Sequence, residues 1–169
     1  MSIIIILVIG ILIYRKSKKI IIARRLKRDD KIRFIDDLTC LKNRAYLSDS
    51  LKAWNNNTIY PQTIIVVDLN RLKEINDKYG VEEGDKQIRG LANALIKTQL
   101  DNSDLMRSDG NEFVIYAVGY TQKQIVSYIH KISKELKKLP YNYGAEFGYS
   151  IIENKLKTIE DALNEATMD

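Results

Sequence analysis

Two acidic residues of this chain stand where burial would make a carboxylate costly. Asp68 ends the apolar run TIIVVDL, and Glu112 begins the second arm of a hairpin expected around Asp109-Gly110. If the two strands are neighbours, both carboxylates meet at one edge of a sheet. Carboxylates placed in this way hold a hard cation such as Mg²⁺, which in turn holds phosphates. The alternatives are a solvated strand end for Asp68 and a surface pair between Glu112 and Arg107 across the hairpin.

Three further polar residues lie between these carboxylates, near the start of an expected helix and a Gly-containing bend. They are Lys73, Asn76 and Asp85, all within DLNRLKEINDKYGVEEGD. A lysine neutralises phosphate, while an amide and a carboxylate together complement the donor and acceptor pattern of a guanine edge. Helix caps are the alternative for Asn76 and Asp85, and a solvated helix lysine is the alternative for Lys73.

Three blocks of the sequence, in this order and spacing, resemble the signature blocks of the GGDEF domain. They are DDLTCLKNRAYL (36–47), DLNRLKEINDKYGVEEGD (68–85) and RSDGNEF (107–113). The resemblance covers roughly residues 35–169. GGDEF domains with complete motifs are diguanylate cyclases, which join two GTP molecules into cyclic di-GMP across a dimer of domains. The resemblance therefore implies a guanine nucleotide ligand, Mg²⁺ as cofactor, and a second copy or another GGDEF domain as partner.

Carried over by position, the resemblance implies a role for ten residues. The Mg²⁺ ligands would be Asp68, the backbone carbonyl of Leu69, and Glu112. The phosphate-binding turn would be Lys73 with the backbone around Arg71 and Leu72. Asn76 and Asp85 would read guanine, and Gly110 would let the hairpin backbone pass close to the nucleotide. The tenth residue is Asn111, at the third motif position.

Asn111 occupies the third motif position, where the family has Asp or Glu to bind metal and to help activate the attacking 3′-hydroxyl. An amide oxygen coordinates only weakly, carries no charge and cannot accept the proton. Asp109 replaces the first glycine and places a negative side chain beside the phosphates. The chain also ends inside its last expected helix, before the Lys and Arg with which the family grips the distal phosphates. Either the sequence is incomplete or that grip is missing.

Three hypotheses follow for function. The favoured one is a degenerate GGDEF module that binds GTP or a partner domain and signals with cyclase activity weak or lost. The alternative is an active diguanylate cyclase in which Asp68 and Glu112 alone hold enough metal. Loss of a general base typically costs ~10²–10⁴-fold in rate, so slow activity fits either of the two. A purely structural dimerisation module would bind no nucleotide.

The elements that must position these residues are predicted by hydrophobic patterning. Strands are expected at TIIVVDL, on both sides of Asp109-Gly110, and at AEFGYSII, the Asp-Gly pair favouring positive φ in the turn. A helix capped by Asn43 should bury Leu47, Leu51 and Trp54, and another over 82–99 should bury a stripe that includes Ile96. Further helices are expected before Pro140 and at the chain end. This predicts an α+β fold with a mostly antiparallel sheet flanked by helices, in agreement with the nucleotide-cyclase palm of GGDEF domains.

The net charge of +5 is distributed unevenly. Residues 1–35 hold ten Lys/Arg against two Asp, and the remainder holds seventeen basic against twenty acidic residues. A mildly acidic domain argues against nucleic acid as the partner. Residues 1–19, MSIIIILVIGILIY with the basic flank RKSKK, are expected to be a membrane anchor that either spans the bilayer or lies in its surface. Residues 20–35 would form a basic helical stalk, and residues 36–169 a GGDEF-like domain in the cytoplasm, at the cell membrane.

Overall fold

The structure is a computed structural model that describes residues 13–21, 32–141 and 143–168. The chain divides into two units, Met1–Phe34 and Ile35–Asp169. In the first unit, residues 13–21 are helical, and the apolar side chains of Ile13, Tyr14 and Ile21 are exposed.

The predicted anchor and stalk lie largely outside the described residues. Most of the apolar run (1–12) and the middle of the stalk (22–31) belong to the segments that are not described. Within the part of the chain that is described, no helix is long and apolar enough to cross a membrane. Anchor and stalk therefore stay predictions.

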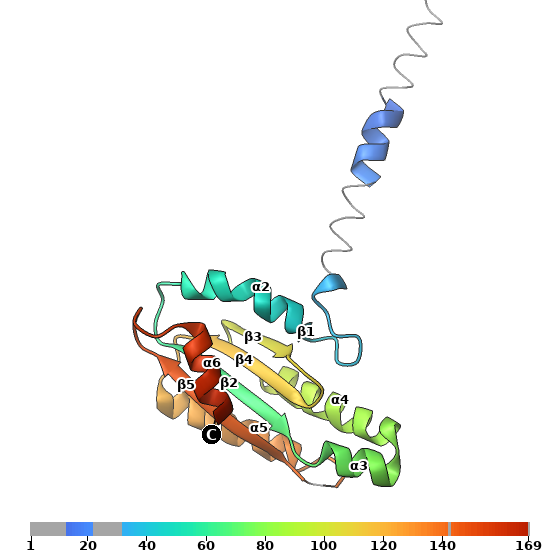
Figure 1. Ribbon diagram of the computed structural model, residues 1–169, viewed down its shortest axis with the longest axis vertical. Coiled ribbons are helices and arrows are strands. Elements are labelled where there is room, and N and C mark those ends of the chain that lie inside the picture. The colour runs from blue at the N-terminus through green and yellow to red at the C-terminus, as the bar shows by residue number, and fades with distance from the viewer. Residues whose placement is uncertain (1–12, 22–31, 142, 169) are drawn as a thin grey trace, which may run out of the picture. The chain divides into compact units, whose positions relative to one another are not determined.

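The second unit is built on a five-stranded sheet in the order β1-β3-β4-β2-β5 (Figure 1). The strands are β1 (Lys42–Asn43), β2 (Gln62–Leu69), β3 (Ser103–Arg107), β4 (Glu112–Val118) and β5 (Ala145–Ile152). All pairings are antiparallel except the short parallel pairing of β1 with β3. The sheet is therefore mixed and, as predicted, mostly antiparallel, with TIIVVDL inside β2, an interior strand between β4 and β5.

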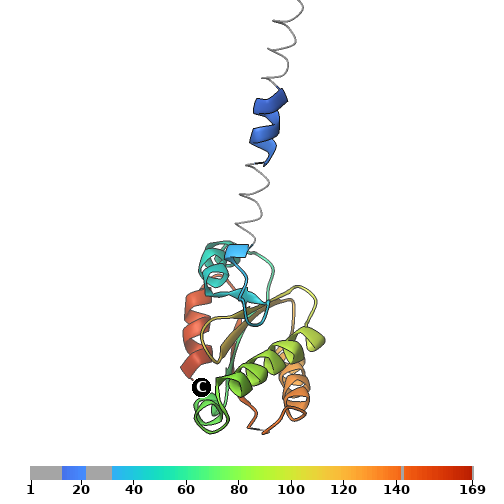
Figure 2. The ribbon, with the colours of Figure 1, turned by 90° about the vertical axis from the view of Figure 1, so that its right-hand side faces the viewer.

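Helices cover both faces of this sheet (Figures 1 and 2). The helices are α2 (Arg44–Asn55), α3 (Leu72–Tyr79), α4 (Val81–Thr98), α5 (Gln122–Leu136) and α6 (Ile159–Met168). Ile65 and Val67 of β2 pack in one core with α4 and α5, whereas Ile64 and Val66 pack in a second core with α2 and α6. Because successive side chains of a strand point to opposite faces, a strand between two cores must be apolar throughout.

Local capping explains where two of the helices begin. The Asn43 side chain accepts a hydrogen bond from the backbone N–H of Tyr46, which confirms the predicted N-cap of α2. Thr121 and Gln124 form a capping box at the start of α5. One burial prediction is wrong: Ile96 of α4 is 48% exposed. The stripe that packs on the sheet is centred on Leu91 and Leu95, which turns Ile96 towards solvent.

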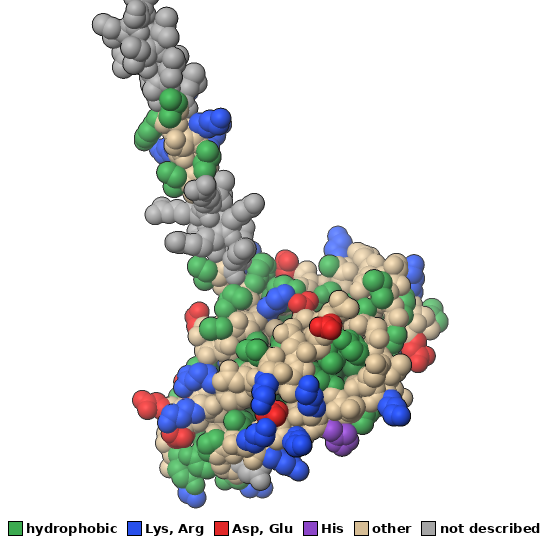
Figure 3. All heavy atoms as spheres, turned by 180° about the vertical axis from the view of Figure 1, so that it is seen from behind, with side chains coloured by type: hydrophobic (Ala, Val, Ile, Leu, Met, Phe, Trp, Pro, Cys, Tyr) green, Lys and Arg blue, Asp and Glu red, His purple; other side chains and the backbone are tan. Residues whose placement is uncertain are grey.

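The outer surface of α5 and of the turn after it is rich in exposed lysines. Figure 3 shows basic side chains gathered around the single His, His130, on this side of the molecule. The exposed lysines are Lys123, Lys131, Lys134, Lys137 and Lys138. Glu135 accepts hydrogen bonds from Lys138 and Lys97, and these bonds lower the pKa of its carboxyl to about 2.

Candidate functional site

Three carboxylates form a row across one end of the sheet. Asp68 of β2 lies directly opposite Glu112 of β4 on one side and opposite Glu146 of β5 on the other. Directly opposed residues of antiparallel strands share a face, and here it is the face covered by α2 and α6. Burial, together with the charges of Glu112 and Glu146, raises the pKa of the Asp68 carboxyl. The predicted meeting of Asp68 and Glu112 is confirmed.

Glu146 was missed by the sequence reasoning. It lies in the expected strand AEFGYSII, but nothing local in that strand shows which β2 residue it faces. The pairing of β2 with β5, seventy-eight positions apart, decides this. An acidic residue in a mostly apolar and aromatic strand was the one available signal.

Asn111 is held against the end of β2 by both its backbone and its side chain. Its side-chain Nδ2 donates to Asp68 Oδ1 and, at 3.3 Å, to the Leu69 carbonyl oxygen. Its own backbone carbonyl accepts from the Leu69 N–H at 3.0 Å. Asp68 and the Leu69 carbonyl are the two groups of β2 that the family resemblance assigns to Mg²⁺. In this structure both are engaged by the amide of the residue that replaces the family's acid.

The donor set as arranged does not fit a bound Mg²⁺. The ion requires several oxygen ligands converging at about 2.0–2.1 Å, and the Asn111 N–H group occupies the place where they would converge. Among the described residues, no group of three or more His, Cys, Asp or Glu side chains is placed to hold a metal ion.

Glu112 is bound by a hydroxyl and not by an arginine. Its Oε1 accepts a hydrogen bond from Ser108 Oγ at 2.6 Å. Arg107 instead directs Nη1 to both oxygens of Asp36 at 3.2 Å, and its Nε and Nη2 to the Gly110 carbonyl oxygen at 3.1 and 2.7 Å. The alternative of an Arg107–Glu112 pair is therefore wrong, because Asp36, from the first signature block, competes for the guanidinium.

The hairpin is confirmed, but its turn differs from the prediction. Four residues, 108–111, separate β3 from β4, and the Ser108 N–H donates to the Glu112 carbonyl at 3.0 Å. Neither Asp109 nor Gly110 has a positive φ. The expected positive φ belongs to tight two-residue turns, whereas a longer loop closes with ordinary backbone angles. The Asp109 carboxylate caps the loop by accepting from the Gly110 N–H at 2.8 Å.

The three residues predicted to bind phosphate lie at the start of α3. Arg71 is the N-cap of α3, in the left-handed conformation with φ of 54°. Its guanidinium lies 5.3 Å from the Tyr143 ring centroid and 3.7 Å from a Glu74 carboxylate oxygen. Lys73 is exposed, and Leu72 packs partly against the core. The turn thus presents two exposed cations to solvent, and phosphate binding by them stays a prediction.

Asn76 and Asp85, the predicted guanine readers, stand on the neighbouring helices α3 and α4. Neither is a helix cap, because the N-caps of the two helices are Arg71 and Gly80. That alternative is wrong. Asn76 Oδ1 is buried and has no hydrogen-bond partner. This oxygen packs against Gly84 of α4, so the group of Asn76 that could donate to a guanine O6 is its amide nitrogen.

Gly84 of α4 creates the space in which the Asn76 amide lies. A Cβ at this position would stand 1.8 Å from Asn76 Oδ1. We expect Gly84→Ala to displace the Asn76 side chain and to weaken guanine nucleotide binding by about tenfold or more, the equivalent of one or two lost hydrogen bonds. Alanine also favours a helix interior over glycine by ~0.5–1 kcal/mol, so fold stability should change little. Titration calorimetry measures the nucleotide affinity of this variant, and thermal unfolding measures its stability. Unaltered nucleotide affinity would contradict the role of Asn76.

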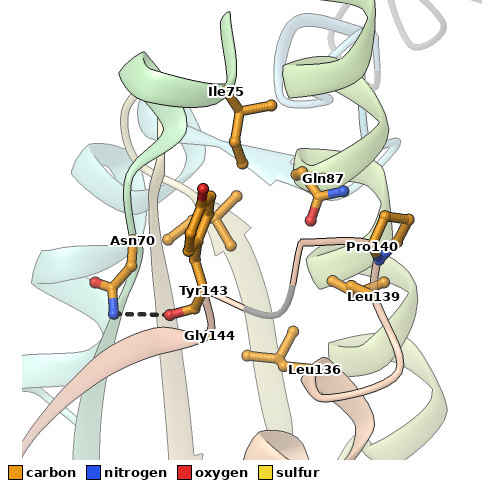
Figure 4. A pocket seen from close by; sticks show the side chains of 9 residues that line it. Asn70, Ile75, Gln87, Leu136, Leu139, Pro140, Tyr143 and Gly144 are labelled. Atoms are coloured by element: carbon orange, nitrogen blue, oxygen red, sulfur yellow. Dashed lines mark hydrogen bonds between the residues drawn. The ribbon is translucent and has the colours of Figure 1, made fainter. Parts of the chain in front are cut away.

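Two cavities adjoin this end of the sheet. The one drawn in Figure 4 lies between the end of β2, α4 and the segment after α5, where Asn70 donates to the Tyr143 carbonyl at 3.2 Å. Its volume of about 10 Å³ suits one water molecule, not a nucleotide. A larger cleft of about 410 Å³ lies between α2 and α6, beside Glu112. Its lining carries Asp109, Glu112 and Glu160 but a single cation, Arg44, so it repels a phosphate chain.

Comparison with known proteins identifies the family. Residues 33–168 match the sequence pattern of the family described as diguanylate cyclase, GGDEF domain. The chain belongs to the GGDEF family. The resemblance stated from the three signature blocks is therefore confirmed, and the domain is a diguanylate cyclase-like signalling domain.

Among curated relatives, the diguanylate cyclase DosC of Escherichia coli K12 is 28% identical over 107 residues, which are 62% of this chain and 23% of DosC. The cyclic di-GMP phosphodiesterase PdeR of the same strain is 25% identical over 130 residues, 73% of this chain and 19% of PdeR. The chain thus spans about a fifth to a quarter of the length of these relatives. One of these relatives is named a cyclase and the other a phosphodiesterase, so a GGDEF domain occurs in proteins of different activity.

Solved structures agree on the GGDEF fold. The coiled coil and GGDEF domain of DgcB from Caulobacter crescentus, solved in complex with c-di-GMP, superposes with a TM-score of 0.77 at 20% identity. The superposition covers 93% of this chain and 91% of that one. At this identity the likeness establishes the fold alone, a mixed five-stranded sheet flanked by helices.

Proposed function

We propose that this GGDEF domain binds GTP or a partner domain and signals with little or no synthesis of cyclic di-GMP. The observation that carries the proposal is the position of Asn111. Its amide stands at the hairpin position where a carboxylate would accept the proton of the attacking hydroxyl, and an amide cannot accept it. Loss of such a base lowers a rate by ~10²–10⁴-fold, which leaves binding as the main property of the site.

The residues that would hold the nucleotide are retained around α3 and α4. Asn76 and Asp85 would recognise guanine, the first by donating its amide N–H to O6 and the second by accepting from N1–H and N2–H₂. Lys73 and Arg71 are exposed cations at the α3 start, where phosphates would meet positive charge and free backbone N–H groups. Recognition and chemistry therefore depend on different elements, and one can be kept while the other is lost.

Membrane attachment and pairing of domains belong to the same proposal. Residues 1–19 would anchor the chain, residues 20–35 would form the stalk, and the domain would face the cytoplasm. The exposed Ile13, Tyr14 and Ile21 of the described helix support contact with an apolar phase, and the following Arg and Lys residues support contact with anionic headgroups. A second copy or another GGDEF domain would be the partner.

GTP titration into the whole chain, followed by analysis of the same mixture for cyclic di-GMP, tests the proposed function. We expect binding without product, and a loss of affinity of about tenfold or more in Asp85→Ala, which removes the acceptor for guanine N1–H and N2–H₂. Product formed at an ordinary cyclase rate would overturn the proposal in favour of an active enzyme. Absence of both binding and product would leave a module that recognises only proteins.

A further inference from the structure

We propose that the Asn111 side-chain amide takes the place of a divalent cation in this domain. The hairpin is fastened to the end of β2 by N–H donors of the chain itself, and the native site does not bind Mg²⁺. This deepens the proposed function, but it rests on the geometry around Asp68 and does not require that the domain bind GTP.

The first support is that donors and acceptors match in number. A side-chain amide nitrogen carries two hydrogens. Asn111 Nδ2 has two acceptors, Asp68 Oδ1 and the Leu69 carbonyl oxygen, and both belong to β2. A cation at this place would draw the same two oxygens together, so the amide reproduces the attraction of the ion for them without a charge of +2.

The second support is that the site already holds several negative charges, and the Asn111 amide adds no further one. Asp68 already faces Glu112 and Glu146 in the pairing of the strands. A carboxylate at position 111 would stand within hydrogen-bonding distance of Asp68, where two carboxylates cannot both stay ionised without a cation between them. An asparagine at position 111 avoids this additional carboxylate, and its amide donates a hydrogen bond to Asp68.

The third support is that further oxygens of the hairpin have hydrogen-bond partners in the chain. Glu112 accepts from the Ser108 hydroxyl at 2.6 Å, and the Asn111 carbonyl accepts from the Leu69 N–H at 3.0 Å. Arg107 holds the Gly110 carbonyl at 2.7 Å, which fixes the residue before Asn111. These contacts position the hairpin through groups of the protein itself.

Thermal unfolding of the full chain with Mg²⁺ or with EDTA tests the inference. The native melting temperature should be the same in both, within about 1 °C. Asn111→Asp should be less stable than the native chain in EDTA and should regain on the order of 5 °C when Mg²⁺ is added, because the new carboxylate creates a site that only the folded state offers. Asn111→Ser, which lacks both the charge and the N–H donors, should lose stability equally in the two conditions.

A control separates the cation site from general effects of salt. In the double variant Asp68→Asn with Asn111→Asp, the response to Mg²⁺ should disappear while K⁺ at equal ionic strength has no effect on any variant. A native melting temperature raised by Mg²⁺, and no longer raised in Asp68→Asn, would overturn the inference. So would an Asn111→Asp variant that is indifferent to both EDTA and Mg²⁺. Either failure leaves the proposed function standing, since GTP binding and product formation are measured separately.

Discussion

Replacing Gly148 with alanine is expected to lower the free energy of unfolding by about 3 kcal/mol, the upper end of the usual cost of overpacking a core. Gly148 lies in β5 under helix α6, and a Cβ there would stand 1.8 Å from the Ala166 carbonyl oxygen and 2.8 Å from its carbonyl carbon. Both are backbone atoms, so no side-chain rotation relieves the clash. Helix α6 must move as a body, and its buried Ile159 and Ala162 would lose their packing.

Urea unfolding at equilibrium measures this cost, and Gly90→Ala is the matched control. At Gly90 a Cβ would meet the Leu139 Cδ2 at 2.6 Å, which is the far end of a flexible side chain. We expect this variant to stay within ~1 kcal/mol of the native chain, because the gain in helix propensity offsets the shift of Leu139. Equal stability of Gly148→Ala and the native chain would contradict the close approach of α6 to the sheet.

Arg107→Ala is expected to destabilise the domain by about 2 kcal/mol, a magnitude typical of hydrogen bonds to charged groups. The guanidinium joins Asp36 to the Gly110 carbonyl, and the Arg107 and Asp36 side chains are only 15% and 21% exposed. Arg107→Lys should recover part of the loss, since a lysine keeps the charge but not the planar fork. A double-mutant cycle with Asp36→Asn, measured by urea unfolding, isolates the contribution of the pair.

The same pair predicts a dependence on pH. Burial raises the pKa of the Asp36 carboxyl, but hydrogen bonds from Thr39 and the charge of Arg107 outweigh it and hold the pKa below its ordinary value of 3.8. A carboxyl with a lowered folded pKa stabilises the fold above its unfolded pKa, and this contribution is lost as pH falls through the folded pKa. The native chain should therefore lose more stability than Asp36→Asn when pH falls below about 4. If the free energy of unfolding of the two chains falls in parallel as pH is lowered, the stabilising role of the ionised Asp36 is contradicted.

The reliable predictions from sequence were those that depend on neighbouring residues. The N-cap at Asn43 forms within four residues of chain, and the burial of β2 on both faces follows from five consecutive apolar or β-branched residues before Asp68. The adjacency of Asp68 and Glu112 depended on a condition that the sequence left open, namely that their strands are neighbours, and the pairing of β2 with β4 meets that condition. The prediction of a positive φ at Asp109-Gly110 was wrong, because the residue types indicate a turn but do not fix its length.

The sequence by itself determined the family, most of the strands and helices in their order, and the identity of the residue at the third hairpin position. The tertiary structure alone decided what that residue does, because a side chain's partners depend on strand register and packing between distant segments. In the folded chain the Asn111 amide donates to Asp68 and Leu69, and Arg107 pairs with Asp36. Strand pairing also places Glu146 beside Asp68 in the row of carboxylates. Hydrogen-bond donors and charges act over a few ångströms, and only the folded chain sets those distances.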